Sequence, residues 1–254
     1  MEKLFIRVMN NSQLKYIKSL NRSKNRKELG VFFIEGKRLI ESAILYGADI
    51  KNIYMTHDFF AQNSTLVDSI LKKNLNHTVI KTKQIEQISF TKTSPGIGAI
   101  CKMPEKNILP LDNKCWLFLD GISDPGNMGT ILRSAAYFNF INIALSKKCV
   151  DPFNPKVIRA GMGAHFRVSL IMDTDLNQFK PTHLLIGADQ RGKNYKNFQY
   201  PEKYVIVFGN EAHGLTEDSL KSLDQFVSIE KKGFGESLNV ASASSIIMHF
   251  LSER

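Results

Sequence analysis

The sequence has few of the residues that build disulfide-bonded, metal-binding or membrane-spanning proteins. Its three cysteines, Cys101, Cys115 and Cys149, lie in apolar surroundings without a Cys-X-X-Cys pair, so we expect reduced core thiols and no zinc site. The six histidines include no His-X-X-X-His pair, and no metal is expected. No apolar run approaches the roughly 20 residues of a membrane-spanning helix.

A dinucleotide-binding fingerprint and a secretion signal are also missing. The segments Gly161-Met162-Gly163 and Gly233-Phe234-Gly235 lack the third glycine of the Gly-X-Gly-X-X-Gly pattern. This argues against the oxidoreductase interpretation, an ordinary Rossmann dehydrogenase. Arg7 follows Leu4-Phe5-Ile6 directly, so the first residues lack the apolar core of a signal peptide. Together with the reduced thiols, this predicts a cytoplasmic protein.

Positive charge is abundant, by contrast, and it is concentrated in the first part of the chain. The formal net charge is +10, and residues 1–106 hold 18 Lys and Arg against 9 Asp and Glu, whereas the remainder holds 16 against 15. A run with no acidic residue contains Lys15, Lys18, Arg22, Lys24, Arg26 and Lys27. Such a run is either a solvated helix face or a surface that contacts a phosphate backbone, and we favour nucleic-acid contact.

Apolar patterns in residues 1–106 predict a compact α/β domain. The expected elements are a basic helix at Ser12–Glu28, a helix at Gly36–Tyr46, and strands at Val31–Ile34, Ile50–Met55, His77–Lys81 and Ile97–Lys102. Residues 107–113 have few apolar anchors and include Pro110. They are predicted to form a linker between two domains.

Residues 114–254 alternate between apolar runs and helical patterns. Near-continuous apolar runs, typical of strands covered on both faces, occur at Cys115–Leu119, Ile141–Leu145, His183–Ala188 and Tyr204–Phe208. Because helical patterns separate these runs, the fold class expected is α/β, with a parallel, doubly wound sheet.

Three polar segments of this second part resemble the three motifs of the SpoU (TrmH-type) RNA ribose 2′-O-methyltransferases. The matching residues are Asn127, Gly129 and Arg133 in the first, Gly209-Asn210-Glu211 and Gly214 in the second, and Ser237-Leu238-Asn239-Val240 in the third. The segment Arg159–Arg167 resembles the family's sequence between motifs one and two. The resemblance covers roughly residue 114 to the C-terminus, and a weaker similarity to the family's N-terminal substrate-binding domain covers much of the rest.

The resemblance implies an activity, a cofactor and partners. A methyl group would pass from S-adenosylmethionine to a ribose 2′-hydroxyl of structured RNA, ribosomal or transfer, in a homodimer. It also implies a deep trefoil knot at the C-terminal end, which chain patterns alone would argue against. One departure is visible, because the family carries Ile-Pro-Met before motif three, where this chain reads Ile229-Glu230-Lys231-Lys232.

The same resemblance assigns five residues to the reaction. Arg133 would activate the 2′-hydroxyl. It lies six residues beyond Asn127, and we expect it on nearly the same helical face. Because the helical run around it is apolar, we also expect its side chain to be buried against an anionic group. Asn127 and Glu211 would support it, and Ser237 and Asn239 would reach the same site. Each has a plainer interpretation: an exposed helix arginine, a turn or N-cap asparagine, a solvated loop carboxylate, and ordinary N-caps of the last helix.

Cofactor and RNA contacts are assigned in the same way. The cofactor is expected against the backbone of Gly209, Ile229 and Leu238, with Gly187 and Asn239 nearby, glycine permitting close approach of the adenosine. Each glycine could equally be a strand-end turn. RNA contacts are expected from Arg22, Lys24, Arg26 and Lys27, and from Arg159. The chief rival interpretation is a non-catalytic RNA-binding protein with a degenerate methyltransferase domain, which the presence of all five reaction residues disfavours.

Overall fold

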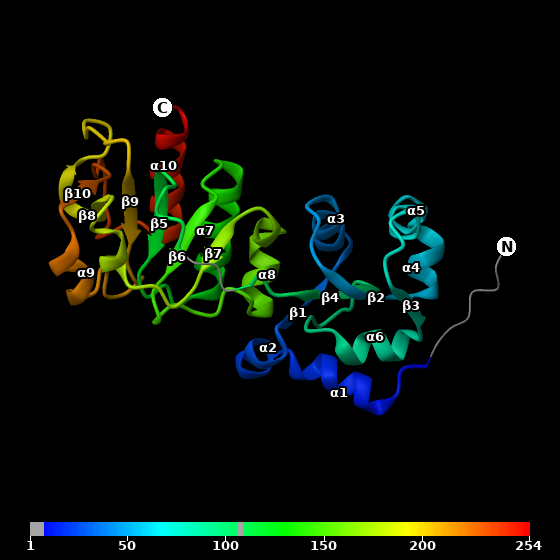
Figure 1. The fold of residues 1–254 in the computed structure, drawn as a ribbon. Helices are drawn as coiled ribbons and strands as arrows, with labels where there is room; N and C mark the ends of the chain where they lie inside the picture. The colour runs from blue at the N-terminus through cyan, green and yellow to red at the C-terminus, as the bar shows by residue number, and fades with distance from the viewer. Residues whose placement is uncertain (1–7, 106–108) are drawn as a thin grey trace. The chain divides into compact units, whose positions relative to one another are not determined.

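The computed structural model describes residues 8–105 and 109–254, and the chain divides into two compact units (Figure 1). One unit takes the chain up to Pro104 together with Phe153–Phe166, and the other takes Glu105–Pro152 and Arg167–Arg254. Part of the predicted linker, residues 107–108, lies outside the described residues. The return of Phe153–Phe166 to the first unit has no counterpart in the predicted division along the chain.

The first unit is built on a mixed four-stranded sheet with the order β1-β4-β2-β3. Strand β4 runs antiparallel to both β1 and β2, whereas β2 and β3 are parallel. Its strands are β1 (Val31–Glu35), β2 (Ile50–Thr56), β3 (His77–Ile80) and β4 (Ile97–Lys102), and its helices are α1 (Asn11–Ser19), α2 (Ser23–Leu29), α3 (Lys37–Leu45), α4 (His57–Gln62), α5 (Ser64–Lys72), α6 (Thr82–Ile88) and α8 (Pro155–Gly161). The four strands predicted here are confirmed to within one residue at each end.

The predicted basic helix over residues 12–28 is wrong, because the chain breaks it into α1 and α2. Helix α1 begins with a capping box, in which Asn10 and Gln13 exchange hydrogen bonds, and it ends at Ser19. The Arg26 guanidinium, buried at 1 % exposure, donates to the Leu20 carbonyl over 2.7 Å. A buried cation that satisfies a carbonyl at the end of α1 stabilises the turn between the helices more than a straight continuation could.

Aromatic packing explains why Phe153–Phe166 belongs to the first unit. The Phe32 ring on β1 lies 4.9 Å from the ring of Phe153 and 6.3 Å from that of Phe166, centroid to centroid. Phe32 and Phe153 are both almost fully buried. Burial of large aromatic side chains is among the strongest contributions to a core, so β1 holds this segment in place.

The second unit contains a six-stranded sheet in which every pair of neighbours is parallel, with the order β10-β8-β9-β5-β6-β7. Its strands are β5 (Cys115–Leu119), β6 (Asn142–Leu145), β7 (Ser169–Ile171), β8 (Leu184–Asn194), β9 (Tyr204–Phe208) and β10 (Gln225–Ser228). The parallel sheet and the four predicted strands are confirmed. The two short outer strands β7 and β10 were not predicted, and β8 continues into polar residues beyond its apolar run.

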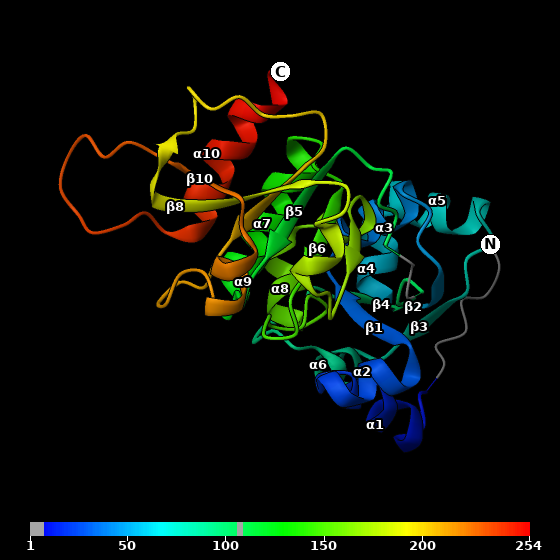
Figure 2. The ribbon, with the colours of Figure 1, turned by 60° about the vertical axis from the view of Figure 1, so that its left-hand side comes forward.

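Helices cover both faces of this sheet. On one face, Trp116 and Phe118 of β5 cluster with Phe179 of the short 3-10 helix η2 (Leu176–Phe179) and with the flank of α9 (Glu217–Ser222). The alternate residue Leu117 is also fully buried. Helices α7 (Pro125–Tyr137) and α10 (Val240–Ser252) pack against each other (Figure 2), and their hydroxyls at Ser134 and Ser245 lie 2.7 Å apart. No helix among the described residues is long and apolar enough to cross a membrane.

Candidate active site

Helix α7 starts at the carboxyl end of the central strand β5, and its first turn holds Asn127. Asp124 is the N-cap, with its carboxylate accepting from the Asn127 amide N–H over 2.8 Å, and Pro125 follows at the first helical position. Proline is favoured there because the missing N–H would have no partner in the helix. The cap of this helix is therefore Asp124, and the Asn127 side chain is left available for other contacts.

The Glu211 carboxylate joins the loop after β9 to the start of α7. Its Oε2 accepts from the backbone N–H and the hydroxyl of Ser123 over 3.2 and 3.0 Å. Its Oε1 accepts from the Asp124 N–H and the Asn127 amide, each over 3.1 Å. The Asn210 amide also donates to Oε2 over 3.3 Å. A half-buried carboxylate with five donors is not a solvated loop residue, so that alternative does not hold.

Burial by itself raises the pKa of the Glu211 carboxyl group, and the hydrogen bonds oppose that effect. Donation from Asn127 and from the backbone of Ser123 and Asp124 favours the ionised form, so the net pKa is lowered from its ordinary value. Glu211 is thus a stable carboxylate whose acceptor positions are largely committed to the protein. A group of this kind positions its neighbours rather than accepting a proton near neutral pH.

Asn239 connects the last helix to the same cluster. It is the N-cap of α10, with Oδ1 accepting from the Ala241 and Ser242 amides over 2.9 and 3.3 Å. Its Nδ2 donates to Asn127 Oδ1 over 2.9 Å. Asn239 is therefore both the N-cap of α10 and a member of the polar cluster. Through the chain Glu211–Asn127–Asn239, all three motif segments meet at the carboxyl ends of β5 and β9.

Arg133 differs from its prediction. Its side chain is exposed, and it makes no hydrogen bond or ion pair among the residues described. Six residues at 3.6 per turn separate it from Asn127 by about 120° around α7, so the two are not on one face. The apolar residues next to it, Ile131 and Leu132, carry the buried stripe of the helix instead. The Arg133 side chain is therefore open to solvent, which is the plainer of its two interpretations.

Motif three is otherwise open. Ser237 and Leu238 are exposed, as is Phe234 in the same loop, and Ser237 forms no hydrogen bond within the described part of the chain. Ile229 follows β10 directly and is half-buried. The structure thus brings Asn239 to the cluster and leaves Ser237 in solvent.

The two predicted glycines are needed by the protein's own packing. A Cβ on Gly209 would lie 2.3 Å from the carbonyl carbon of Gly214 and 2.4 Å from the amide nitrogen of Leu215. A Cβ on Gly187 would meet the side chains of Leu223 and Leu215 at 2.8 and 3.0 Å. At both positions a side chain would point into the protein and clash with it. Glycine is therefore required by internal packing, whereas close approach of an adenosine was the reason expected from the sequence.

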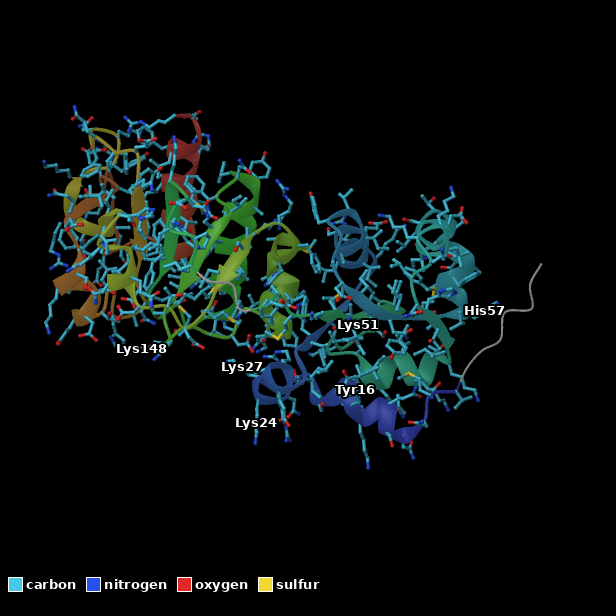
Figure 3. The ribbon with its side chains drawn as sticks, viewed as in Figure 1. Tyr16, Lys24, Lys27, Lys51, His57 and Lys148 are labelled. Atoms are coloured by element: carbon cyan, nitrogen blue, oxygen red, sulfur yellow. The ribbon has the colours of Figure 1, made fainter. Side chains whose placement is uncertain are left out.

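The predicted RNA-contact residues separate into two groups. Arg22, Lys24 and Lys27 are exposed, and Figure 3 shows Lys24 and Lys27 projecting from α2. Arg159 is exposed too, beside a cavity of about 240 Å³ within the first unit. Arg26 is buried and donates to the carbonyl at the α1–α2 turn, so its expected contact with RNA does not fit its position.

Three residues that complete the cluster were given no role from the sequence, although Asn210 lies within the second motif. Asn210 donates to the Gly121 carbonyl over 2.7 Å and accepts from the Ala212 and His213 amides, which closes the turn that carries Glu211. Ser123 and Asp124 supply three of the donors to Glu211. The Asp-Pro dipeptide at a helix start was a readable capping signal, whereas the partners of Ser123 depend on a residue 88 positions away.

The sequence matches two family models that together cover most of the chain. Residues 114–249, more than half of the chain, match the SpoU rRNA Methylase family, and residues 11–99 match the MRM3-like substrate binding domain. The chain belongs to the SpoU rRNA Methylase family, and it is a methylase of that class.

Some relatives match nearly the whole length of the chain, and others match about two thirds of it. The chain is 27% identical over 246 residues to the 23S rRNA (guanosine(2553)-2′-O)-methyltransferase RlmP of Bacillus subtilis, covering 95% of this chain and 96% of the relative. It is 36% identical over 180 residues to the human mitochondrial rRNA methyltransferase 3, and the match covers 66% of this chain and 42% of the relative. A solved structure of a putative RNA methyltransferase of the TrmH family from Porphyromonas gingivalis superposes with a TM-score of 0.83 at 26% identity. The superposition covers 95% of this chain and 97% of the solved one.

Proposed function

We propose that this protein transfers a methyl group from S-adenosylmethionine to a ribose 2′-hydroxyl of ribosomal RNA. The observation that carries the proposal is the hydrogen-bonded chain Glu211–Asn127–Asn239, which brings residues of all three motifs to one point. Relatives named as rRNA methyltransferases supply the substrate class.

The donor fits the open segment after β10. S-adenosylmethionine supplies a methyl group on a sulfonium, a good leaving group, so the protein needs mainly to position and to handle one proton. Leu238 and Phe234 expose apolar side chains on the segment that carries motif three, and an adenosine or methionine portion would cover such surface. We propose that Ile229, Leu238 and Asn239 hold the donor, with the backbone at Gly187 and Gly209 beneath it. A solved AdoMet-bound rRNA methyltransferase from Sinorhizobium meliloti shares the fold, with a TM-score of 0.82 at 24% identity.

The chain's polar residues divide the remaining tasks. Asn127, fixed between Glu211 and Asn239, orients the ribose. Arg133 is exposed and without a protein partner among the described residues, so it is free to meet the hydroxyl and the adjoining phosphate of the RNA. A guanidinium remains protonated near neutral pH, so loss of the hydroxyl proton requires help from that phosphate. Ser237, also exposed, would contact the same substrate.

The first unit supplies the RNA contacts in this proposal. It matches a substrate-binding domain and carries most of the positive excess. Arg22, Lys24, Lys27 and Arg159 are exposed and would pair with phosphates. The rival interpretation is a non-catalytic RNA-binding protein. Such a protein would not need Glu211, Asn127 and Asn239 to be held together by hydrogen bonds, so this interpretation is disfavoured.

Finer features of the molecule are also proposed. We infer a homodimer, a cytoplasmic location suited to three free thiols, and a doubly wound sheet with a C-terminal trefoil knot. Support for the knot is the path of the chain, which leaves the sheet edge at β10 and returns as α10 against α7 beside the central strand β5. If the knot is present, joining the chain ends covalently would give a ring that stays more compact in denaturant than an unknotted ring of the same mass.

The test of the activity is methyl transfer from radiolabelled S-adenosylmethionine to ribosomal RNA that lacks ribose methylation. The proposal predicts label in the RNA, with the labelled linkage resistant to alkaline hydrolysis because the 2′-oxygen is blocked. Label in a base, or RNA binding without any transfer, would contradict it.

A further inference from the structure

A polar cavity of about 530 Å³ opens in the second unit at the carboxyl ends of β5 and β6. Its walls come from the loop after β6, from the segment around η2 and from α9, and Phe118 forms part of the floor. None of the residues assigned to the reaction or to the donor lines it. A volume in this range accommodates a ligand of nucleotide size.

Four lysines surround this cavity: Lys147, Lys148, Lys180 and Lys221. All four side chains are exposed, and within the described residues none of their ammonium groups makes a hydrogen bond or an ion pair; Figure 3 shows Lys148 at the surface of this unit. The second unit has almost no net charge, so a local group of unpaired lysines is not a consequence of composition. Like charges gathered around a concave surface create a potential that favours an anion.

The carboxylates at the cavity are largely committed to the protein. Asp120, only 2 % exposed, accepts from the Thr216 amide over 2.9 Å. Asp175 accepts from the backbone and side-chain amides of Asn177 over 2.9 and 3.1 Å. The third carboxylate, Asp218, is exposed and makes no side-chain hydrogen bond in the described part of the chain. Four lysines against three carboxylates leave the lining with a formal excess of one positive charge, and the lysine side chains are the polar groups left open to a ligand.

The cavity is joined to Glu211 by a path of three hydrogen bonds. Ser146, on the cavity wall, accepts from the Gly121 amide over 3.0 Å. The Gly121 carbonyl accepts from Asn210, whose same amide lies 3.3 Å from Glu211 Oε2. The cavity and the cluster around Asn127 therefore share the loops that follow β5, β6 and β9, which places both at the carboxyl ends of the same strands.

We propose that this cavity binds a nucleotide of the RNA substrate adjoining the methylated one, with its phosphates paired to Lys147, Lys148, Lys180 and Lys221. The inference rests on the proposed function and deepens it, because it assigns to the methylase unit a second RNA contact apart from the basic helices of the first unit. A free nucleotide carries the same phosphate chemistry and is the competing source of the anion.

The test compares two variants of the full chain that remove the same charge. Lys148→Ala/Lys180→Ala alters the cavity, and Lys114→Ala/Lys203→Ala removes two lysines that precede β5 and β9, at the opposite edge of the sheet. Lys114 forms an ion pair with Glu202, but both side chains are exposed, and loss of such a pair changes stability little. Binding of a labelled single-stranded RNA of mixed sequence is followed by fluorescence anisotropy over a range of salt concentrations. Affinity for RNA falls as salt rises, and each lysine that pairs with a phosphate makes this fall steeper. Removing one such lysine should reduce the magnitude of the slope of log affinity against log salt by about 0.7.

The expected result is a lower slope for the cavity variant, an unchanged slope for the control, and unchanged melting temperatures for both. In methyl transfer, the cavity variant should raise KM for RNA while kcat and donor affinity stay as in the unaltered protein. Equal slopes for both variants would overturn the proposal, as would displacement of the RNA by micromolar adenosine 5′-diphosphate, which would assign the cavity to a free nucleotide. The binding comparison needs no turnover, so failure of this proposal and failure of the methylase activity are distinguishable.

Discussion

At the scale of single residues, Glu211 shows how one side chain can fix three segments of the chain. It gathers donors from Ser123, Asp124 and Asn127, and Asn127 then holds Asn239. Each hydrogen bond to a charged acceptor contributes about 1.5–3 kcal/mol when its partners are otherwise buried, and less where water competes. The site is therefore ordered before any substrate arrives.

Replacing Glu211 by Gln should lower stability in a pH-dependent way. A carboxyl group whose pKa is lowered on folding stabilises the protein above its unfolded-state pKa, and this contribution is lost as the pH falls through the folded-state value. The gap in melting temperature between the unaltered protein and Glu211→Gln should be widest near pH 7 and should close below the ordinary value of 4.5. Thermal unfolding followed by circular dichroism measures it; a gap that does not vary with pH would show that the charge is not responsible.

Arg133→Ala should abolish methyl transfer without affecting the fold. Because the side chain is exposed and has no partner in the described residues, its removal should leave the melting temperature and donor binding unchanged. A positioning and proton-handling residue contributes a rate factor of roughly 10² to 10⁴, and Arg133→Lys should also be largely inactive because it loses the planar fork. Single-turnover methylation is the measurement, and rates within a few-fold of the unaltered protein would refute the role assigned to Arg133.

At the scale of secondary structure, the start of α7 combines a cap with Asn127, the residue proposed to orient the ribose. Asp124→Ala removes the side-chain cap and should cost about 1 kcal/mol, and it should also slow methylation because Asn127 is in the same turn. Asn10→Ala, which removes the cap of α1 in the other unit, is the matched control: it should lose comparable stability and keep kcat. Equal effects of the two variants on kcat would mean that the α7 cap has no part in positioning Asn127.

The α1–α2 turn separates a structural arginine from surface lysines. Arg26→Ala should lower the free energy of unfolding by about 1.5–3 kcal/mol, because the Leu20 carbonyl loses a charged, buried donor. Lys24→Ala/Lys27→Ala should leave stability unchanged and lower the salt dependence of RNA binding instead. Chemical denaturation and RNA titration separate the two effects. Loss of stability in the lysine variant, or none in Arg26→Ala, would reverse the assignment.

The elements that could be predicted from sequence are those with their own local signal. Apolar runs located β5, β6, β8 and β9, because buried parallel strands consist of apolar residues. Strands β7 and β10 have only three and four residues and are defined by their neighbours. The break before Ser23 escaped prediction because it depends on burial of Arg26, a charged residue that a pattern places on the surface.

The candidate site was predictable in its members and not in its geometry. Motif resemblance selected Asn127, Glu211 and Asn239, and the structure brings them together. The separation of Arg133 from Asn127 around α7 follows from their spacing, but the exposure of Ser237 depends on the path of its loop, and the packing at Gly209 depends on Gly214. The last two could not be read from the motifs alone.

At the scale of the whole molecule, the exchange of Phe153–Phe166 limits what truncation can test. Deleting residues 1–106 would remove β1 and expose Phe153 and Phe166, which pack on Phe32. We therefore expect the remaining chain to aggregate, and substitution of surface lysines to be the better test of RNA binding by the first unit.

Self-association is the second prediction at this scale. Tyr137 and Ile246, on α7 and α10, expose apolar surface, and burial of such patches is a common basis of homodimers. Light scattering at micromolar concentration should give twice the chain mass, and Ile246→Lys should shift it toward the monomer. A monomeric mass with full activity would contradict the proposed dimer.

The central claim is that the cluster around Glu211 orients a ribose for methylation, and single-turnover transfer to ribosomal RNA tests it most directly. With RNA and labelled S-adenosylmethionine both saturating, the unaltered protein should label the RNA at a ribose 2′-oxygen. Asn127→Ala should reduce the rate by a factor of about 10² or more, with donor affinity retained. No ribose label from the unaltered protein, or an undiminished rate in Asn127→Ala, would contradict the account.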